Sequence, residues 1–179
     1  MNTSAPLRFL CFALLALLVA GCASGNKPAP ASVANVDLDR YMGRWYVISN
    51  IPYFLEKHKV ASYDTYARKV DGTLVNKFTF RDKAFAAPEK TWEGTAKIID
   101  PSNAIWKVSF IWPVSSTYRI LALDPNYQWS VVSNGDADLI WVLSRERHLS
   151  PETYAAIVND LRLRGLPADK LVTVPQPET

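Results

Sequence analysis

The sequence predicts an all-β domain of eight short antiparallel strands, followed by one α-helix. Between residues 41 and 144, short runs rich in β-branched and aromatic residues alternate with turn signals. After residue 149 the apolar residues recur at helical spacing. Strands linked this closely favour an antiparallel barrel or sandwich, because parallel strands need long crossover connections.

Eight runs have the length and composition of strands. They span residues 43–51, 61–70, 73–81, 91–100, 105–112, 117–124, 129–133 and 139–144. Asp71-Gly72 is a hairpin signal, which makes the second and third runs neighbours. Turn residues also occur at 100–103, 124–126 and 134–136, and residues 171–174 could add a short final strand.

The single helix is predicted to begin after Ser150, whose side chain can cap it. Pro151 suits the first helical position, and Gly165 provides a stop. One apolar stripe is formed by Tyr154, Ile157, Val158 and Leu161. We therefore expect this helix to pack against the outside of the sheet.

The N-terminus has the layout of a secretory signal peptide. Arg8 precedes an uncharged, mostly apolar run from residue 9 to 20, which is shorter than the roughly 20 residues of a bilayer span. Residues 18–22, Leu-Val-Ala-Gly-Cys, resemble a bacterial lipobox, and this resemblance implies a diacylglyceryl group on Cys22. The alternatives are a buried helix and a cleaved signal without lipidation.

These features divide the chain into a signal peptide at 1–21, a lipidated N-terminus and linker at 22–35, and a folded domain at 36–179. The linker is small, polar and proline-bearing, as expected of an irregular tether. In such lipoproteins an Asp after the cysteine marks retention in the inner membrane. Ala23 therefore implies a lipid anchor in the outer membrane, on its periplasmic face.

Composition excludes several classes of function. The net charge is only +3, and the basic residues are scattered among acidic ones, so no nucleic-acid partner is expected. Cys11 leaves with the signal, so no disulfide can form within the mature chain and no cysteine remains as a metal ligand. No catalytic or phosphate-binding motif occurs, and we expect a non-enzyme without a metal or a cofactor.

Three motifs resemble those of the lipocalin family, in the same order along the chain. Gly43 and Trp45 match a G-x-W signature on the first strand, and Asp124 and Tyr127 match a D-x-x-Y turn. Arg145 stands where the family places an arginine over the signature tryptophan. Together with the signal sequence, the resemblance is to bacterial outer-membrane lipoprotein lipocalins, which are close to apolipoprotein D. It implies an eight-stranded up-and-down barrel with the C-terminal helix packed outside.

Side chains alternate between the two faces of a strand, so parity predicts the inner wall. The expected ligand-binding residues are Tyr66, Phe78, Phe80, Trp92, Trp106, Phe110, Tyr118 and Trp141. The same alternation places these further residues inside: Val47, Ser49, Ser62, Asp64, Leu74, Asn76, Gly94, Ala96, Ile98, Val108, Ile120, Ala122, Leu139 and Leu143. A mostly apolar wall with few polar groups is typical of a small-molecule pocket, and the alternative is a barrel filled as a solid core.

The resemblance implies a fatty acid or lysophospholipid ligand, in a monomer or homodimer tied to a membrane. The competing interpretation is a structural or chaperone-like envelope lipoprotein that binds a protein partner. A ligand head group would need a cation near the mouth, and the candidates are Arg44, Lys57, His58, Lys59 and Arg81. The loop segment 53–55 is a lid, a membrane contact or a local cluster.

Overall fold

The computed structural model describes residues 29–178. The predicted signal peptide, Cys22 and the first part of the linker therefore lie outside the described residues. The elements follow the predicted order, and they begin with a short helix, α2, that was not predicted. They are α2 (Leu38–Tyr41), β1 (Gly43–Asn50), β2 (Lys59–Arg68), β3 (Leu74–Asp82), β4 (Glu89–Ile98), β5 (Ile105–Ile111), β6 (Val114–Leu123), β7 (Trp129–Asn134), β8 (Ile140–Ser144), α3 (Pro151–Leu163), the 3₁₀-helix η1 (Ala168–Lys170) and β9 (Val172–Thr173).

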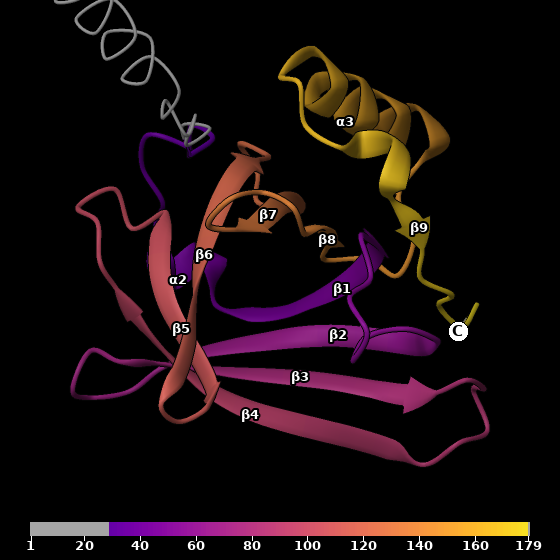
Figure 1. Cartoon of the computed structure of the whole chain (residues 1–179), viewed down its shortest axis with the longest axis horizontal. Helices are drawn as coiled ribbons and strands as arrows, with labels where there is room; N and C mark the ends of the chain where they lie inside the picture. Colours follow the sequence, from indigo (N-terminus) through magenta and orange to yellow (C-terminus); the bar gives the residue numbers. More distant parts are fainter. Residues whose placement is uncertain (1–28, 179) are drawn as a thin grey trace, which may run out of the picture.

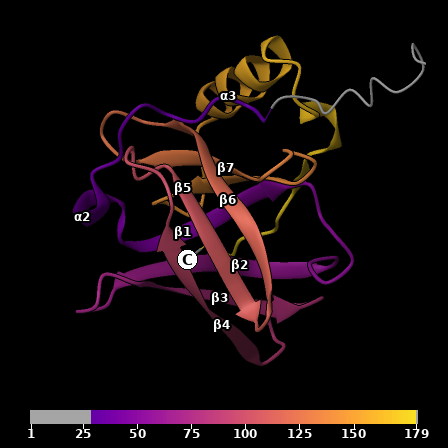
Figure 2. The same ribbon diagram turned by 60° about the vertical axis from the view of Figure 1, so that its left-hand side comes forward.

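The strands form a closed antiparallel barrel, which confirms the up-and-down architecture. Each strand from β2 to β8 pairs with the next one along the chain, and β1 pairs with both β8 and β2. Figures 1 and 2 show how the sheet coils until its two ends meet. Closure leaves no long unpaired edge that could recruit another strand.

Helix α3 lies against the outer wall of the barrel, as its apolar stripe predicts. Ser150 accepts a hydrogen bond from the backbone N–H of Thr153, and Gly165 takes the positive φ of 68° that ends the helix. Ile157 and Leu161 pack on a second, outer core formed with β6, β7 and β8. Among residues 29–178, no helix is long and apolar enough to cross a bilayer.

One end of the barrel, here called the floor, is closed by Arg145. Its guanidinium carbon lies 3.7 Å from the centroid of the Trp45 ring. The guanidinium also donates to the carbonyls of Arg40 at 2.6 Å, Arg44 at 2.7 Å and Met42 at 3.0 Å. A single side chain thereby joins the helix α2, the start of β1 and the end of β8.

The D-x-x-Y turn completes the floor. Asp124 accepts hydrogen bonds from the backbone N–H groups of Asn126 at 2.9 Å and Gln128 at 3.1 Å, which shapes the turn between β6 and β7. The Tyr127 hydroxyl accepts a hydrogen bond from the N–H of Asp37, the residue that caps α2. The three motif regions identified in the sequence therefore meet at one end of the barrel.

Three residues predicted to face the interior do not do so. Two of them lie next to β-bulges, and the third lies before the start of a strand. A bulge between Val47 and Ser49 turns Ser49 toward Val142 of the outer core. A bulge between Ile120 and Ala122 likewise moves Ala122 to the outer core. Leu139 precedes β8, so strand alternation does not apply to it, and it too packs beneath α3.

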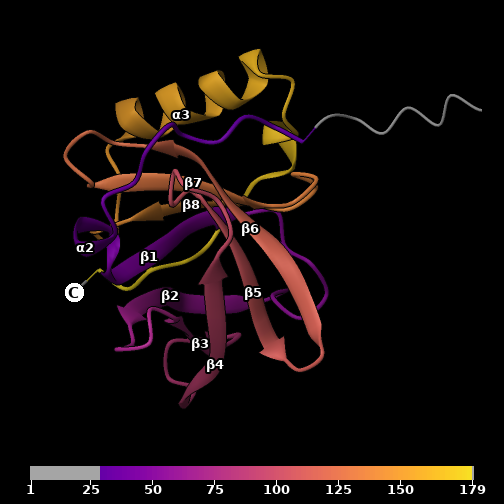
Figure 3. The same cartoon turned by 90° about the vertical axis from the view of Figure 1, so that its left-hand side faces the viewer.

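The C-terminal segment closes the seam between β1 and β2. These strands pair with each other only from residue 43 to 46 of β1, and beyond that point they separate. The segment that follows β9 lies in the gap, where Figure 3 shows it in yellow. The Gln176 amide donates to the carbonyls of Val47 and Ser62, both at 2.9 Å, and the N–H of Ala61 donates to the Pro175 carbonyl.

Replacing Arg145 with Met should lower the free energy of unfolding by about 2–3 kcal/mol, because charge-assisted hydrogen bonds and the cation–π contact are lost together. Urea denaturation followed by circular dichroism measures the change. Arg68→Met is the control, since Arg68 makes only an exposed ion pair, 3.6 Å from Asp39. Equal effects of the two substitutions would contradict the role of Arg145.

Replacing Gln176 with Leu should lower the free energy of unfolding by about 2 kcal/mol, because two buried carbonyls lose their donor. Hydrogen exchange of the β1 and β2 amides next to the seam should also become faster. Glu178→Ala, at an exposed position of the same segment, serves as the control. Unchanged exchange in Gln176→Leu would show that the seam does not need this contact.

Candidate functional site

The barrel interior is the candidate site, and all eight predicted ring residues face it. Register pairs Phe78 with Trp92 across β3 and β4, and Trp106 with Tyr118 across β5 and β6. Every one of the eight except Phe110 belongs to the inner core or packs against it. Phe110 lies over Gly94, where an added Cβ would come within 2.9 Å of the Phe110 ring.

The floor half of the interior is filled with packed rings. Trp106 stacks on Tyr118 at 4.7 Å between centroids and meets Tyr41 and Tyr66 edge-on at 5.5 and 5.4 Å. Trp45 and Trp106 are fully buried. This half matches the alternative expectation of a solid core, and Tyr66 and Trp106 have almost no accessible surface with which to touch a ligand.

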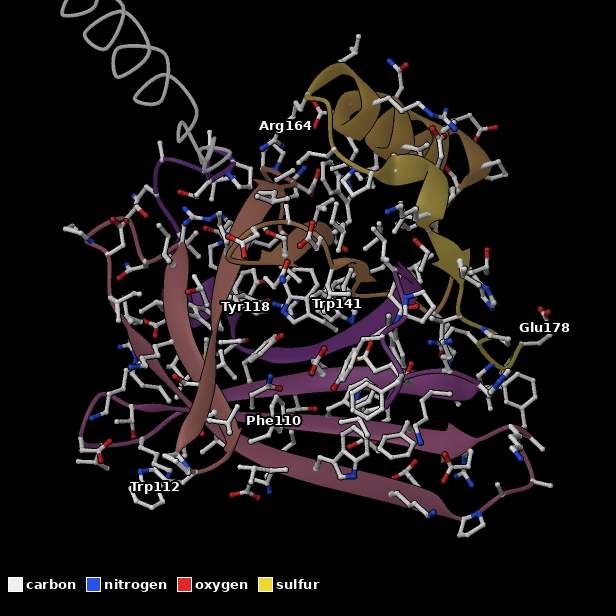
Figure 4. All side chains as sticks on the ribbon, in the orientation of Figure 1. Phe110, Trp112, Tyr118, Trp141, Arg164 and Glu178 are labelled. Atoms are coloured by element: carbon white, nitrogen blue, oxygen red, sulfur yellow. The ribbon has the colours of Figure 1, made fainter. Side chains whose placement is uncertain are left out.

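The half next to the open end, here called the mouth half, is partly accessible. Phe78, Phe80 and Trp92 form a cluster of rings with centroids 4.7 to 5.8 Å apart, in which Phe78 and Phe80 are buried and Trp92 is half-buried. Phe110 points inward yet keeps 41% of its surface exposed, and Trp141 is only half-buried (Figure 4). Apolar surface therefore remains open where an acyl chain could enter from the mouth.

Among the candidate cations, the structure brings Lys59 to the inner wall. A bulge between Val60 and Tyr63 shifts the alternation of β2 by one residue. Lys59 therefore faces inward, although regular alternation from Asp64 predicts that it faces outward. The ammonium of Lys59 lies 4.0 Å from the Phe80 ring centroid and forms an ion pair with Asp82. Asp82 also pairs with Lys90 at 2.7 Å, and the two lysines lower its pKa to about 2.

The other candidate cations do not face the interior. Lys57 and His58 are exposed in the loop between β1 and β2. Arg44 and Arg81 line a groove on the outer wall together with Tyr63 and Glu89. There the Arg44 guanidinium lies 4.3 Å from the centroid of the Tyr63 ring.

The loop over the mouth is attached by Glu56, which sequence analysis did not single out. One carboxylate oxygen accepts hydrogen bonds from the Asn50 amide at 2.7 Å and from the Trp141 indole at 2.8 Å. Burial raises the pKa of this carboxyl, and the two hydrogen bonds oppose the rise. Phe54 in the same loop is exposed, so Glu56 rather than an aromatic ring ties the loop to the barrel.

Deeper inside, Asp64 faces the interior between Trp45 and Phe78, with which it pairs in register. Burial raises the pKa of the Asp64 carboxyl well above its ordinary value, and repulsion from Glu56 raises it further. A hydrogen bond from the Asn76 amide opposes the rise. Within residues 29–178, no group of three or more acidic, histidine or cysteine side chains is placed to hold a metal ion.

The free energy of unfolding should fall as the pH rises above about 4, because a carboxyl with a raised pKa binds more protons in the folded state than in the unfolded one. The free energy of unfolding of Asp64→Asn should fall less between about pH 4 and pH 8 than that of the wild type. Asp100→Asn should run parallel to the wild type over this range, since hydrogen bonds from Ser102 lower the pKa of Asp100 and its effect on stability falls below about pH 4. Urea midpoints across this range test both, and parallel curves for the wild type and Asp64→Asn would contradict the assignment.

Comparison with known proteins agrees with this architecture. A family model described as a lipocalin-like domain matches residues 36–176. The outer membrane lipoprotein Blc of Citrobacter freundii is 34% identical over 167 residues, covering 90% of this chain and 92% of its own. The Escherichia coli (strain K12) protein of that name is 31% identical over 170 residues, with 92% and 94% covered.

Apolipoprotein D of Macaca fascicularis is 29% identical over 160 residues, covering 85% of this chain and 83% of its own. Insecticyanin from the tobacco hornworm Manduca sexta superimposes with a TM-score of 0.67 at 17% identity, covering 84% of this chain and 86% of its own. At that identity the likeness concerns the fold alone. The matching family model and the Blc proteins show that the chain belongs to the lipocalin family.

Proposed function

We propose that this protein binds and carries fatty acids, lysophospholipids or similar amphiphiles in the cell envelope. The observation that carries the proposal is the accessible apolar surface of the mouth half, where Phe110 faces inward and remains 41% exposed. Each CH₂ group moved from water onto such a wall contributes roughly 0.8 kcal/mol. A chain of several such groups would gain several kcal/mol of binding free energy by lying against the accessible parts of Phe110, Trp92 and Trp141.

The rim of the mouth supports entry of ligands from a lipid phase. At the tip of the hairpin between β5 and β6, Ile111, Trp112 and Val114 are 70% or more exposed. Figure 4 shows Trp112 at this tip, directed away from the barrel. Exposed apolar residues gathered at one place mark contact surfaces rather than chance exposure.

A lipid anchor would hold this barrel near its source of ligands. We propose that residues 1–21 are removed, that Cys22 is acylated and that residues 22–35 tether the domain to the periplasmic face of the outer membrane. The support is the lipobox-like sequence and the similarity to proteins named outer membrane lipoproteins. The assigned role is binding and not catalysis, since both histidines, His58 and His148, lie exposed outside the interior.

The competing role as a structural protein with a filled barrel is less well supported. The rings of the floor half are fully packed, whereas Phe110, Trp92 and Trp141 of the mouth half keep accessible surface. Native mass spectrometry of the full chain, purified without detergent, distinguishes the two roles. A co-purified acyl ligand supports the carrier, whereas a bare protein that ignores both added palmitate and an added lysophospholipid supports the filled barrel.

Phe110→Asp should weaken palmitate binding at least about 10-fold, because the substitution removes an apolar ring contact and adds a charge to the wall. Quenching of tryptophan fluorescence measures the affinity. Leu163→Asp is the matched control, since Leu163 is 80% exposed on α3, outside the barrel. Equal affinities of Phe110→Asp and the wild type would place the ligand elsewhere.

A further inference from the structure

The inner wall offers one buried hydrogen-bond acceptor that has no donor, beside a buried carboxyl. Asp64 is 9% exposed and Asn76 is 4% exposed, and both face the interior in register with inward-facing neighbours. The side-chain oxygen of Asn76 has no hydrogen-bond partner among the described residues. A buried acceptor without a donor is unfavourable, because it has lost its hydrogen bonds to water and gained none in return. This position therefore calls for a partner that the described chain does not supply.

The nearby hydroxyls cannot serve as that donor, because each already donates elsewhere. Tyr66 donates to the Tyr118 hydroxyl at 3.1 Å, which leaves Tyr118 to donate to Tyr41 at 2.8 Å. Tyr41 then donates to Ser130 at 3.2 Å, and Ser130 donates to the Ala122 carbonyl at 3.3 Å. Every hydroxyl proton in this chain of four is used.

The cation at the inner wall is also engaged. Lys59 forms its ion pair with Asp82 near the mouth. Glu56 adds a second carboxyl, and its charge repels that of Asp64. The site therefore combines two carboxyls and one free amide oxygen.

We propose that the barrel binds an amphiphile with a primary ammonium group, whose nitrogen donates to the Asp64 carboxylate and to the side-chain oxygen of Asn76. The inference rests on the proposed function and specifies its ligand class. An ammonium supplies three donors and a positive charge that stabilises the ionised form of Asp64. Asp64 and Asn76 are diagonal neighbours on β2 and β3, within reach of one such group. The apolar chain then extends past Phe78 and Trp92 toward the mouth.

This arrangement selects by charge. A free carboxylate placed at the same depth adds a negative charge beside Asp64 and Glu56, two carboxyls whose own negative charge burial already disfavours. A neutral alcohol of the same length can satisfy one acceptor but offers no counter-charge to an ionised Asp64. Affinity should therefore rank ammonium first, alcohol second and carboxylate last at equal chain length.

Dodecylammonium, dodecanol and dodecanoate, titrated into the full chain below their micellar concentrations, test the ranking. We expect dodecylammonium to bind at least about 10-fold tighter than dodecanol, and dodecanoate to bind more weakly than dodecanol. Asp64→Asn should bring dodecylammonium to within about 3-fold of dodecanol, because the shape is kept and the charge is lost. Asp100→Asn, at the outer edge of the floor, should leave the ratio unchanged.

Dodecanoate binding as tightly as dodecylammonium, or an unchanged ratio in folded Asp64→Asn, overturns this inference. If dodecanol still binds in that case, the proposed carrier function stands. If none of the three probes binds, both fail.

A lysophospholipid with an ethanolamine head and its N-acetylated form distinguish the source of the ammonium. A preference for the free amine assigns a phospholipid, and binding of dodecylammonium alone assigns a simple long-chain amine.

Discussion

Arg145 joins the three stretches of chain that close the barrel at its floor. Its guanidinium covers the Trp45 ring and donates to carbonyls of α2 and of the start of β1, while its own backbone continues from β8. Burial lowers the pKa of this group, yet an arginine stays charged far above neutral pH. A permanent cation with several fixed donors suits a place where the backbone carbonyls of separate elements converge.

Because the floor is sealed in this way, the interior divides into two parts with different roles. Near the floor, Tyr41, Tyr66, Trp106 and Tyr118 pack together, and the hydroxyls of the three tyrosines form one hydrogen-bonded chain. Toward the mouth, Trp92, Phe110 and Trp141 keep accessible surface. The packed half and the partly accessible half thus follow one another along the barrel axis. The first stabilises the domain, and the second leaves apolar surface open to solvent.

Much of the fold follows from local pattern. Alternation along the strands brought all eight predicted rings to the interior, because the pleat admits only two faces and one of them is apolar. It failed for Ser49 and Ala122, where a bulge inserts one residue and exchanges the faces. The same effect concealed the inward position of Lys59. Bulges depend on how two strands meet, and the sequence of a single strand carries little sign of them.

The order of the strands and the position and cap of the helix could be predicted from the sequence, since these depend on neighbours along the chain and on turn chemistry. The place of Arg145 over Trp45 came from the resemblance to a family. The contacts of Glu56 at the mouth loop and of Gln176 in the seam, and the donorless Asn76 oxygen beside Asp64, were visible only in the folded barrel. They join residues far apart in sequence, so their energies exist only after the barrel has closed.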